Sequence, residues 1–160
     1  SMTALVNLVS LKELRLSKNQ ISNISAMPNL ANLTFLSLSE NPIDQTQLDS
    51  LASLKSLDIL YLRNNGLSDI SALAPVTTLT RVYLRDNQIS DISVLSNMTN
   101  LSYARLKNNQ ITDISPLMAL EHLTRVSLWG NDNIKCADLD AFIEAKRGTL
   151  IWRPLNCVAD

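Results

Sequence analysis

The chain has 160 residues, of which 46% are apolar and 4% aromatic, and its formal net charge is −1. This length is enough for one domain with a sizeable core, and the near-neutral charge argues against nucleic-acid binding driven by bulk charge. No apolar run reaches the roughly 18 residues of a membrane span, and only three glycines are present, which excludes a β-sandwich or barrel with many tight hairpins.

The first residues carry leucines three positions apart, Leu5, Leu8 and Leu11, like the second half of a longer unit that recurs further on. Either upstream repeats or a native cap preceded this segment, or it is itself a minimal cap. An under-covered first edge would be a site of self-association. The opening Ser1-Met2 pair is typical of a cleaved purification tag, in which case a missing signal peptide says nothing about compartment.

A unit of about 22 residues then recurs six times. Its most regular position is an asparagine, and successive copies are separated by 22, 24, 22, 22 and 22 residues. These are Asn19, Asn41, Asn65, Asn87, Asn109 and Asn131. The asparagine amide can donate to and accept from backbone groups freed by a bend, so stacked copies are expected to form a ladder.

Apolar spacing changes within each unit. Before Asn87 it is two, in Val82 and Leu84, which predicts a strand with one buried face. After Asn87 it becomes three, in Ile89 and Ile92, which predicts a short helical or 3₁₀ return. Because no unit can bury its leucines alone, stacked units are expected to bury them in one continuous column.

Serines are expected to cap the helical returns in the recurring phrase "DIS" and its variant "NIS". They are Ser25, Ser71, Ser93 and Ser115, with Asp69, Asp91 and Asp113 two positions before the last three. The second unit is two residues longer, and Thr46 is predicted to cap a longer helix that buries Leu48, Leu51 and Leu54. The sixth unit has one extra residue, and the repeat stops after Ile134.

The last segment is predicted to cover the open end of the leucine column. Asp138 is expected to cap a helix whose apolar face is Leu139, Phe142 and Ile143 and which ends at Gly148. A short strand, residues 149–152, follows.

The only two cysteines, Cys136 and Cys157, bracket this segment. A disulfide between them would close a loop of about 22 residues, worth about 3 kcal/mol in the chain-entropy model, and would place maturation in an oxidising compartment. The alternative is a pair of reduced, buried thiols.

The pattern resembles the 22-residue class of leucine-rich repeat, and "NQITDISPLMALEHLTRVSL" is similar to the unit "NxIxDIxPLxxLxxLxxLxL" of bacterial internalins. The resemblance covers residues 5 to 134. It implies an α/β repeat: a right-handed solenoid with a parallel β-sheet on the concave face and short helices or 3₁₀ turns on the convex face. The domain organisation expected is repeats over 1–134 and a disulfide-closed helix-strand cap over 135–160, in one structural domain. Internalins end in an immunoglobulin-like region, and the cysteine-bracketed end departs from that.

Residues between the inward leucines should point outward on the concave face, in three columns. Column one is Glu13, Phe35, Ile59, Arg81, Tyr103 and Arg125; column two is Arg15, Ser37, Tyr61, Tyr83, Arg105 and Ser127; column three is Ser17, Ser39, Arg63, Arg85, Lys107 and Trp129. Five of seven aromatics and six of eight arginines fall here, but of fifteen acids only Glu13 does.

Arginine, tyrosine and tryptophan are enriched at protein–protein hot spots, so the columns predict a partner-binding surface. Its residues are Phe35, Ile59, Tyr61, Arg63, Arg81, Tyr83, Arg85, Tyr103, Arg105, Lys107, Arg125 and Trp129. An acidic protein is the partner expected from this charge, with an anionic glycan as the alternative ligand. The alternative is that these side chains form a solvated concave face that binds no ligand.

Catalytic motifs are missing from the sequence: one histidine, His122, is present, and no Ser/His/Asp set, phosphate-cradling glycine loop or metal cluster can be assembled. We therefore expect a non-enzymatic binding module without a cofactor. The internalin resemblance implies a secreted, periplasmic or cell-surface bacterial protein with a role in adhesion, host interaction or virulence. The alternatives are an intracellular regulatory subunit resembling the leucine-rich repeat regulators of protein phosphatase 1, or a targeting domain of a larger protein.

Overall fold

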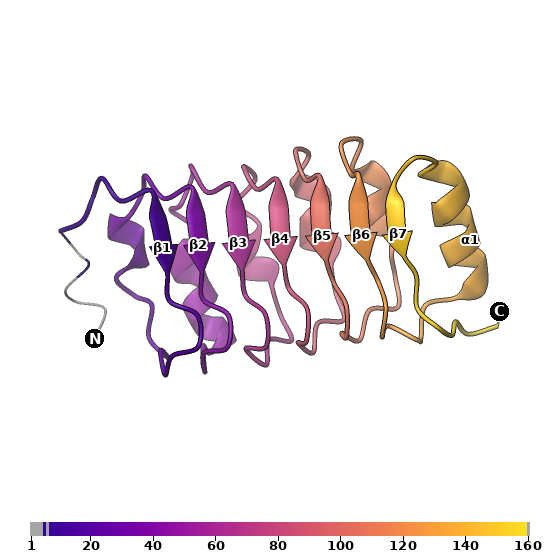
Figure 1. Cartoon of the computed structure of the whole chain (residues 1–160), viewed down its shortest axis with the longest axis horizontal. Helices are drawn as coiled ribbons and strands as arrows, with labels where there is room; N and C mark the ends of the chain where they lie inside the picture. Colours follow the sequence, from indigo (N-terminus) through magenta and orange to yellow (C-terminus); the bar gives the residue numbers. More distant parts are fainter. Residues whose placement is uncertain (1–4, 6, 160) are drawn as a thin grey trace.

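The computed structural model describes residue 5 and residues 7–159; Ser1 and Met2 lie outside this part. Seven parallel strands form one sheet, side by side in chain order (Figure 1). They are β1 (Glu13–Arg15), β2 (Phe35–Ser37), β3 (Ile59–Tyr61), β4 (Arg81–Tyr83), β5 (Tyr103–Arg105), β6 (Arg125–Ser127) and β7 (Leu150–Trp152). The six units of the sequence each supply one strand, and the C-terminal segment supplies the seventh.

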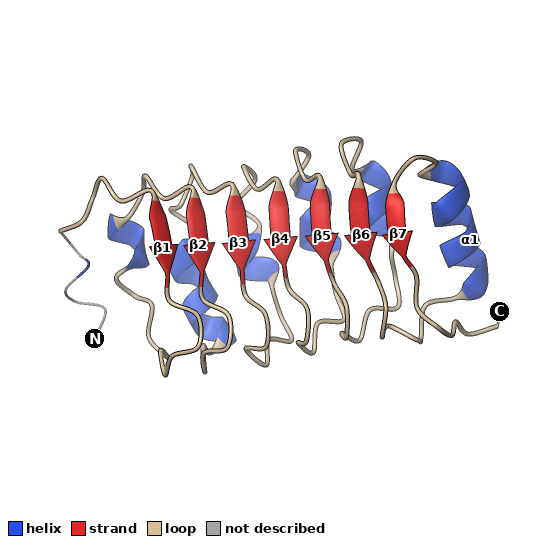
Figure 2. Cartoon of the chain, in the orientation of Figure 1, coloured by secondary structure: helices blue, strands red, loops and turns tan. Residues whose placement is uncertain are grey.

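Short 3₁₀ helices return the chain behind the sheet (Figure 2). They are η2 (Met27–Asn29), η3 (Gln45–Leu51), η4 (Ser71–Leu73), η5 (Ser93–Asn97) and η6 (Ser115–Ala119). The three-residue apolar spacing sets their geometry, since the Leu95 N–H donates to the Ile92 carbonyl and the Met98 N–H to the Leu95 carbonyl, both at 3.0 Å. The predicted return is confirmed. The opposite, strand-lined side is called the sheet face below; it is the concave face of the prediction.

The core is a single column of aliphatic side chains between the sheet and the helical returns. Corresponding leucines of successive units, Leu38, Leu62, Leu84, Leu106 and Leu128, are fully buried. Val82 and Ala104 occupy the same layer as Leu60. Each unit completes its neighbour's burial, as a solenoid requires.

The asparagine ladder is confirmed. The Asn87 side-chain oxygen accepts from the N–H groups of Asn65 (3.0 Å) and Leu67 (3.1 Å), and its Nδ2 donates to the carbonyls of Leu62 (2.9 Å) and Leu84 (2.8 Å). The left-handed backbone of the bend belongs to the residue before each asparagine, with φ between 51° and 76°. These residues are Lys18, Glu40, Asn64, Asp86, Asn108 and Gly130.

The predicted serine caps are wrong. The carboxylate two residues earlier accepts the serine's backbone N–H instead: Asp69 from Ser71 at 2.8 Å and Asp91 from Ser93 at 2.7 Å. Because the serine is the first residue of the 3₁₀ turn, its own N–H is the donor that needs an acceptor, and its hydroxyl cannot supply one.

The predicted cap at Thr46 is wrong in the same way, because the acceptor again lies two residues earlier. Asp44 is the cap of η3, accepting from the Thr46 N–H at 2.9 Å. Leu48, Leu51 and Leu54 are buried as predicted, and η3 is the longest of the named 3₁₀ helices.

The C-terminal segment folds as helix α1 (Cys136–Ala145) followed by β7. Asp138 lies in the first turn of α1 and does not cap it. The Cys136 N–H donates to the Val158 carbonyl at 2.9 Å, so the C-terminal strand segment satisfies a donor that a side-chain cap would otherwise take. Phe142 joins the buried core, and Cys136 and Cys157 form a disulfide bond.

Candidate functional site

The sheet register aligns the outward residues across all six units. Tyr61 lies opposite Tyr83, and Tyr83 opposite Arg105, while Ile59, Arg81, Tyr103 and Arg125 follow one another in the neighbouring column. The third column lies just past the strands and is also paired by the backbone. There the Glu40 N–H donates to the Arg63 carbonyl, the Asn64 N–H to Arg85, the Asp86 N–H to Lys107 and the Asn108 N–H to Trp129. The three predicted columns are therefore real rows of neighbours.

Four aromatic rings on the sheet face form a continuous ladder, defined here as Phe35, Tyr61, Tyr83 and Tyr103. The ring centres of Phe35 and Tyr61 are 5.4 Å apart, those of Tyr61 and Tyr83 stack at 3.9 Å, and those of Tyr83 and Tyr103 meet edge-on at 5.3 Å. The Arg15 guanidinium closes the first end, 3.9 Å from the Phe35 ring centre. Such pairs fix side chains that would otherwise lose rotamer freedom on binding.

Burial and the neighbouring Tyr61 hydroxyl raise the pKa of Tyr83 to about 12. Tyr83 therefore stays neutral throughout the physiological range. It offers a ring and a hydroxyl to a ligand, with no negative charge to repel acidic groups.

Arg105 closes the other end of the aromatic ladder. Its Nε donates to the Tyr103 hydroxyl at 2.5 Å, and its guanidinium carbon lies 5.8 Å from the Tyr83 ring centre and 5.6 Å from that of Tyr103. The remaining guanidinium donors form no ion pair among the described residues.

The positive charge of the sheet face is less uniform than the sequence suggests. Glu40 and Asp86, which precede the ladder asparagines, reach the third column from the bend. Arg63 lies 3.3 Å from Glu40 and 3.5 Å from Asp86, and Arg85 lies 3.4 Å from Asp86. The predicted charge of the face was based on the three columns alone, and these two acids lie outside them, in the bends. Among the cations of the predicted surface, Arg81 on β4 and Arg105, Lys107 and Arg125 form no ion pair with the described residues, so most of the uncompensated positive charge lies toward β5 and β6.

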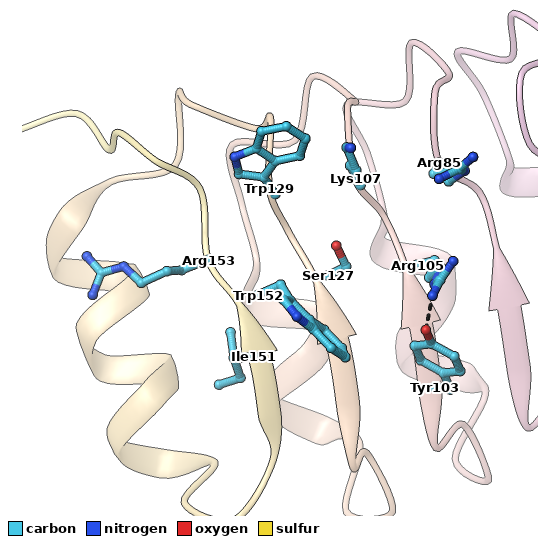
Figure 3. A pocket seen from close by; sticks show the side chains of 9 residues that line it. All are labelled: Arg85, Tyr103, Arg105, Lys107, Ser127, Trp129, Ile151, Trp152 and Arg153. Carbon is cyan, nitrogen blue, oxygen red and sulfur yellow. Dashed lines mark hydrogen bonds between the residues drawn. The ribbon is translucent and has the colours of Figure 1, made fainter.

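A pocket of about 670 Å³ opens at the C-terminal end of the sheet face (Figure 3). Its lining comprises Arg85, Tyr103, Arg105, Lys107, Ser127, Trp129, Ile151, Trp152 and Arg153. The last three and Ser127, which stood in column two, were missing from the predicted partner-binding surface. The signal that could have found Trp152 is the alternation in "LIW", which places Leu150 and Trp152 opposite Arg125 and Ser127 and so continues columns one and two onto β7.

Neither a metal site nor a membrane-crossing helix was found in the described part of the chain. No group of three or more His, Cys, Asp or Glu side chains that could hold a metal ion occurs there. None of its helices has both the length and the apolar composition to span a bilayer.

Comparison with protein families gives matches along most of the chain. A family model described as Leucine Rich repeats (2 copies) matches residues 9–51, 31–75 and 99–144, and one described as Leucine Rich repeat matches 77–96. No curated protein sequence matches significantly.

Solved structures with the same fold include two internalins of Listeria monocytogenes. One (inlF) has 31% identity and a TM-score of 0.90 over all of this chain, which spans 46% of that protein. The other, internalin C2, has 27% identity and a TM-score of 0.76, with coverage of 98% of this chain and 74% of its own. A leucine-rich repeat protein of Leptospira interrogans, at 23% identity and a TM-score of 0.82, covers 92% of this chain and 38% of its own length and shares the fold. The chain, whose units resemble those of internalins, belongs to the leucine-rich repeat family.

Proposed function

We propose that this chain is a non-enzymatic protein-binding module and that its sheet face, centred on the aromatic ladder and Arg105, holds the partner. The observation that carries this is the stacked, pre-ordered row of Tyr61, Tyr83 and Tyr103 with Arg105 beside it. Tyrosine and arginine give large contact area with a polar tip, and rings already fixed against one another lose little entropy on binding. The fold itself is one used for protein interaction, which supports the same assignment.

Substitution at the centre of this face tests the proposal. The double variant Tyr83→Ala/Arg105→Ala should abolish binding to a partner isolated with the wild-type chain, because both side chains lie at the middle of the predicted contact. The matched control is Met118→Ala/His122→Ala, which removes two exposed side chains outside the strands, one on η6 and one in the turn before β6. Thermal melts of both variants verify the fold. Equal loss of binding in the two variants, or none in the first, would contradict the proposal.

We also propose a secreted or cell-surface location. The disulfide supports it, since such bonds persist in oxidising compartments, and so does the resemblance to internalins. A thiol count on natively purified protein, denatured without reductant, should find no free thiol. Two free thiols would instead favour an intracellular regulatory subunit.

A further inference from the structure

The pocket between β5 and β7 combines apolar walls with cations on one side. Trp129 and Trp152 are 37% and 44% exposed, and both line the pocket (Figure 3). The volume of about 670 Å³ falls within the range of roughly 300–1,000 Å³ typical of ligand pockets. A large side chain of a partner could be desolvated there.

Two of the four cations in the lining are available to a ligand. Arg85 is compensated by Asp86, and the Arg153 side chain points away from the other residues in Figure 3. Lys107 and Arg105 form no ion pair among the described residues. The Lys107 ammonium lies 3.8 Å from the centre of the Trp129 ring, which holds it at the pocket.

We infer that this pocket binds an acidic peptide segment, with a large apolar side chain against Trp152 and neighbouring carboxylates at Lys107 and Arg105. The inference rests on the proposed function and gives the partner's chemistry at one end of the sheet face. Interface hot spots usually combine a buried apolar anchor residue with charge-assisted hydrogen bonds around it.

An acidic sugar would match the charge but not the lining. Each sugar hydroxyl removed from water needs a hydrogen-bond partner. Among the described lining residues, no carboxylate or amide side chain is present, and Ser127 supplies the one hydroxyl besides that of Tyr103, which already accepts from Arg105. The pocket therefore favours a peptide.

Tryptophan fluorescence, excited where tyrosine does not absorb, reports on this pocket alone, because Trp129 and Trp152 are the only tryptophans of the chain. The probe is an acetylated, amidated pentapeptide, Asp-Glu-Phe-Glu-Asp, titrated to millimolar concentration. Two control peptides replace the acids with lysine or the phenylalanine with alanine, and sialyllactose is the sugar arm. We expect a saturable change in emission with the acidic phenylalanine peptide and much weaker responses from the other three.

Two variants locate the binding. Lys107→Gln, which keeps both tryptophans, and Trp152→Ala should each weaken the probe about tenfold. Arg147→Gln, which removes an exposed cation just after α1 and outside the pocket, should leave the affinity within about twofold. Circular dichroism verifies that the variants are folded. If a variant misfolds, the control peptides still test on the wild-type chain whether the pocket selects an acidic peptide with a large apolar side chain.

A flat wild-type titration, an equal response to the lysine peptide, or binding of sialyllactose in place of the peptide would overturn the inference. These outcomes differ from failure of the proposed function. Partner binding that is lost in Tyr83→Ala/Arg105→Ala but retained in Lys107→Gln would leave the sheet-face proposal standing while removing this pocket from it.

Discussion

Asn109 joins two successive turns of the solenoid with one side-chain amide. Its oxygen accepts the Ile89 N–H at 3.1 Å, and its nitrogen donates to the carbonyls of Leu84 (3.1 Å) and Leu106 (2.9 Å). The residue is buried, so no water replaces these bonds if the amide is removed. Aspartate has no donor and glutamine is one methylene longer, which explains why asparagine recurs at this position.

Asn109→Ala should lower the free energy of unfolding by about 2–4 kcal/mol, because a buried N–H and two buried carbonyls lose their partner. Asn19→Ala is the matched control: Asn19 is exposed and, among the described residues, bonds only to the Leu16 and Ser17 carbonyls of its own unit. It should cost less than about 1 kcal/mol. Chemical denaturation of both variants measures the difference, and equal costs would refute a structural ladder.

Asp69 and Asp91 link stability to pH through their capping bonds. The backbone N–H groups of Ser71 and Ser93, and secondarily the serine side chains, lower the pKa of these carboxyls below 3.8. A lowered folded-state pKa adds stability that is present above the unfolded value and is lost as pH falls through the folded value.

Asp69→Asn/Asp91→Asn should keep the acceptor and reduce the loss of stability below about pH 4. Asn23 already plays this part in the first unit, accepting from the Ser25 N–H at 2.8 Å. Thermal melts from neutral to acid pH measure the effect. The control Asp132→Asn/Asp140→Asn replaces two exposed acids that accept no hydrogen bond among the described residues, and it should retain the acid sensitivity of the wild type.

At the scale of elements, the terminal cap differs from the units before it. β7 joins the sheet through the Leu128 N–H, which donates to the Trp152 carbonyl at 2.7 Å, while the disulfide and the bridge between Lys135 and Val158 hold the end of the segment near its start. In a solenoid each unit contacts only its neighbours, so damage to the cap should stay local at first.

Cys136→Ala/Cys157→Ala should reduce stability by about 3 kcal/mol in the chain-entropy model. Hydrogen exchange should show lost protection in α1 and β7, with β3 and β4 unchanged at low denaturant. Uniform loss across the sheet, or no change in the cap, would contradict a local role for the disulfide.

The repeat frame, the buried column, the asparagine ladder and the outward columns could all be predicted from the sequence, because each follows from a strict local period. The failures have a common cause, which is competition between neighbours for one backbone donor. Ser93 and Thr46 were expected to cap their helical turns, but the carboxylates of Asp91 and Asp44 accept the backbone N–H groups there. Asp138 was expected to cap α1, but the Val158 carbonyl accepts the N–H at its start. The spacing of residues in the sequence does not by itself identify which of several nearby acceptors binds a given backbone N–H.

The candidate site was predictable where it lies on strands and not where it depends on the bends or the cap. Tyr61, Tyr83 and Arg105 follow from alternation. The pairing of Arg63 and Arg85 with Asp86 depends on a side chain reaching in from a left-handed bend. Trp152 lies in a segment whose sequence no longer repeats, so the period could not assign it to the sheet face.

Over the whole molecule, the two sides of the solenoid differ in chemistry. Six of the seven aromatic residues lie on the sheet face, the exception being Phe142 in the core of the cap, and the uncompensated cations gather toward its C-terminal half. Met118 is an exposed apolar side chain on η6, at the back. Electrostatic steering should therefore deliver an acidic partner to β5 and β6 first, and its association rate should fall as ionic strength rises.

The most direct test of the account is hydroxyl-radical footprinting of the chain with and without a partner captured by the wild-type protein. Tyrosine, tryptophan and methionine side chains are the reporters, and they lie on both sides of the molecule. Tyr83, Tyr103 and Trp129 are expected to lose reactivity in the complex while Met118 keeps it. Protection of Met118 with unchanged reactivity at Tyr83 and Tyr103 would contradict it.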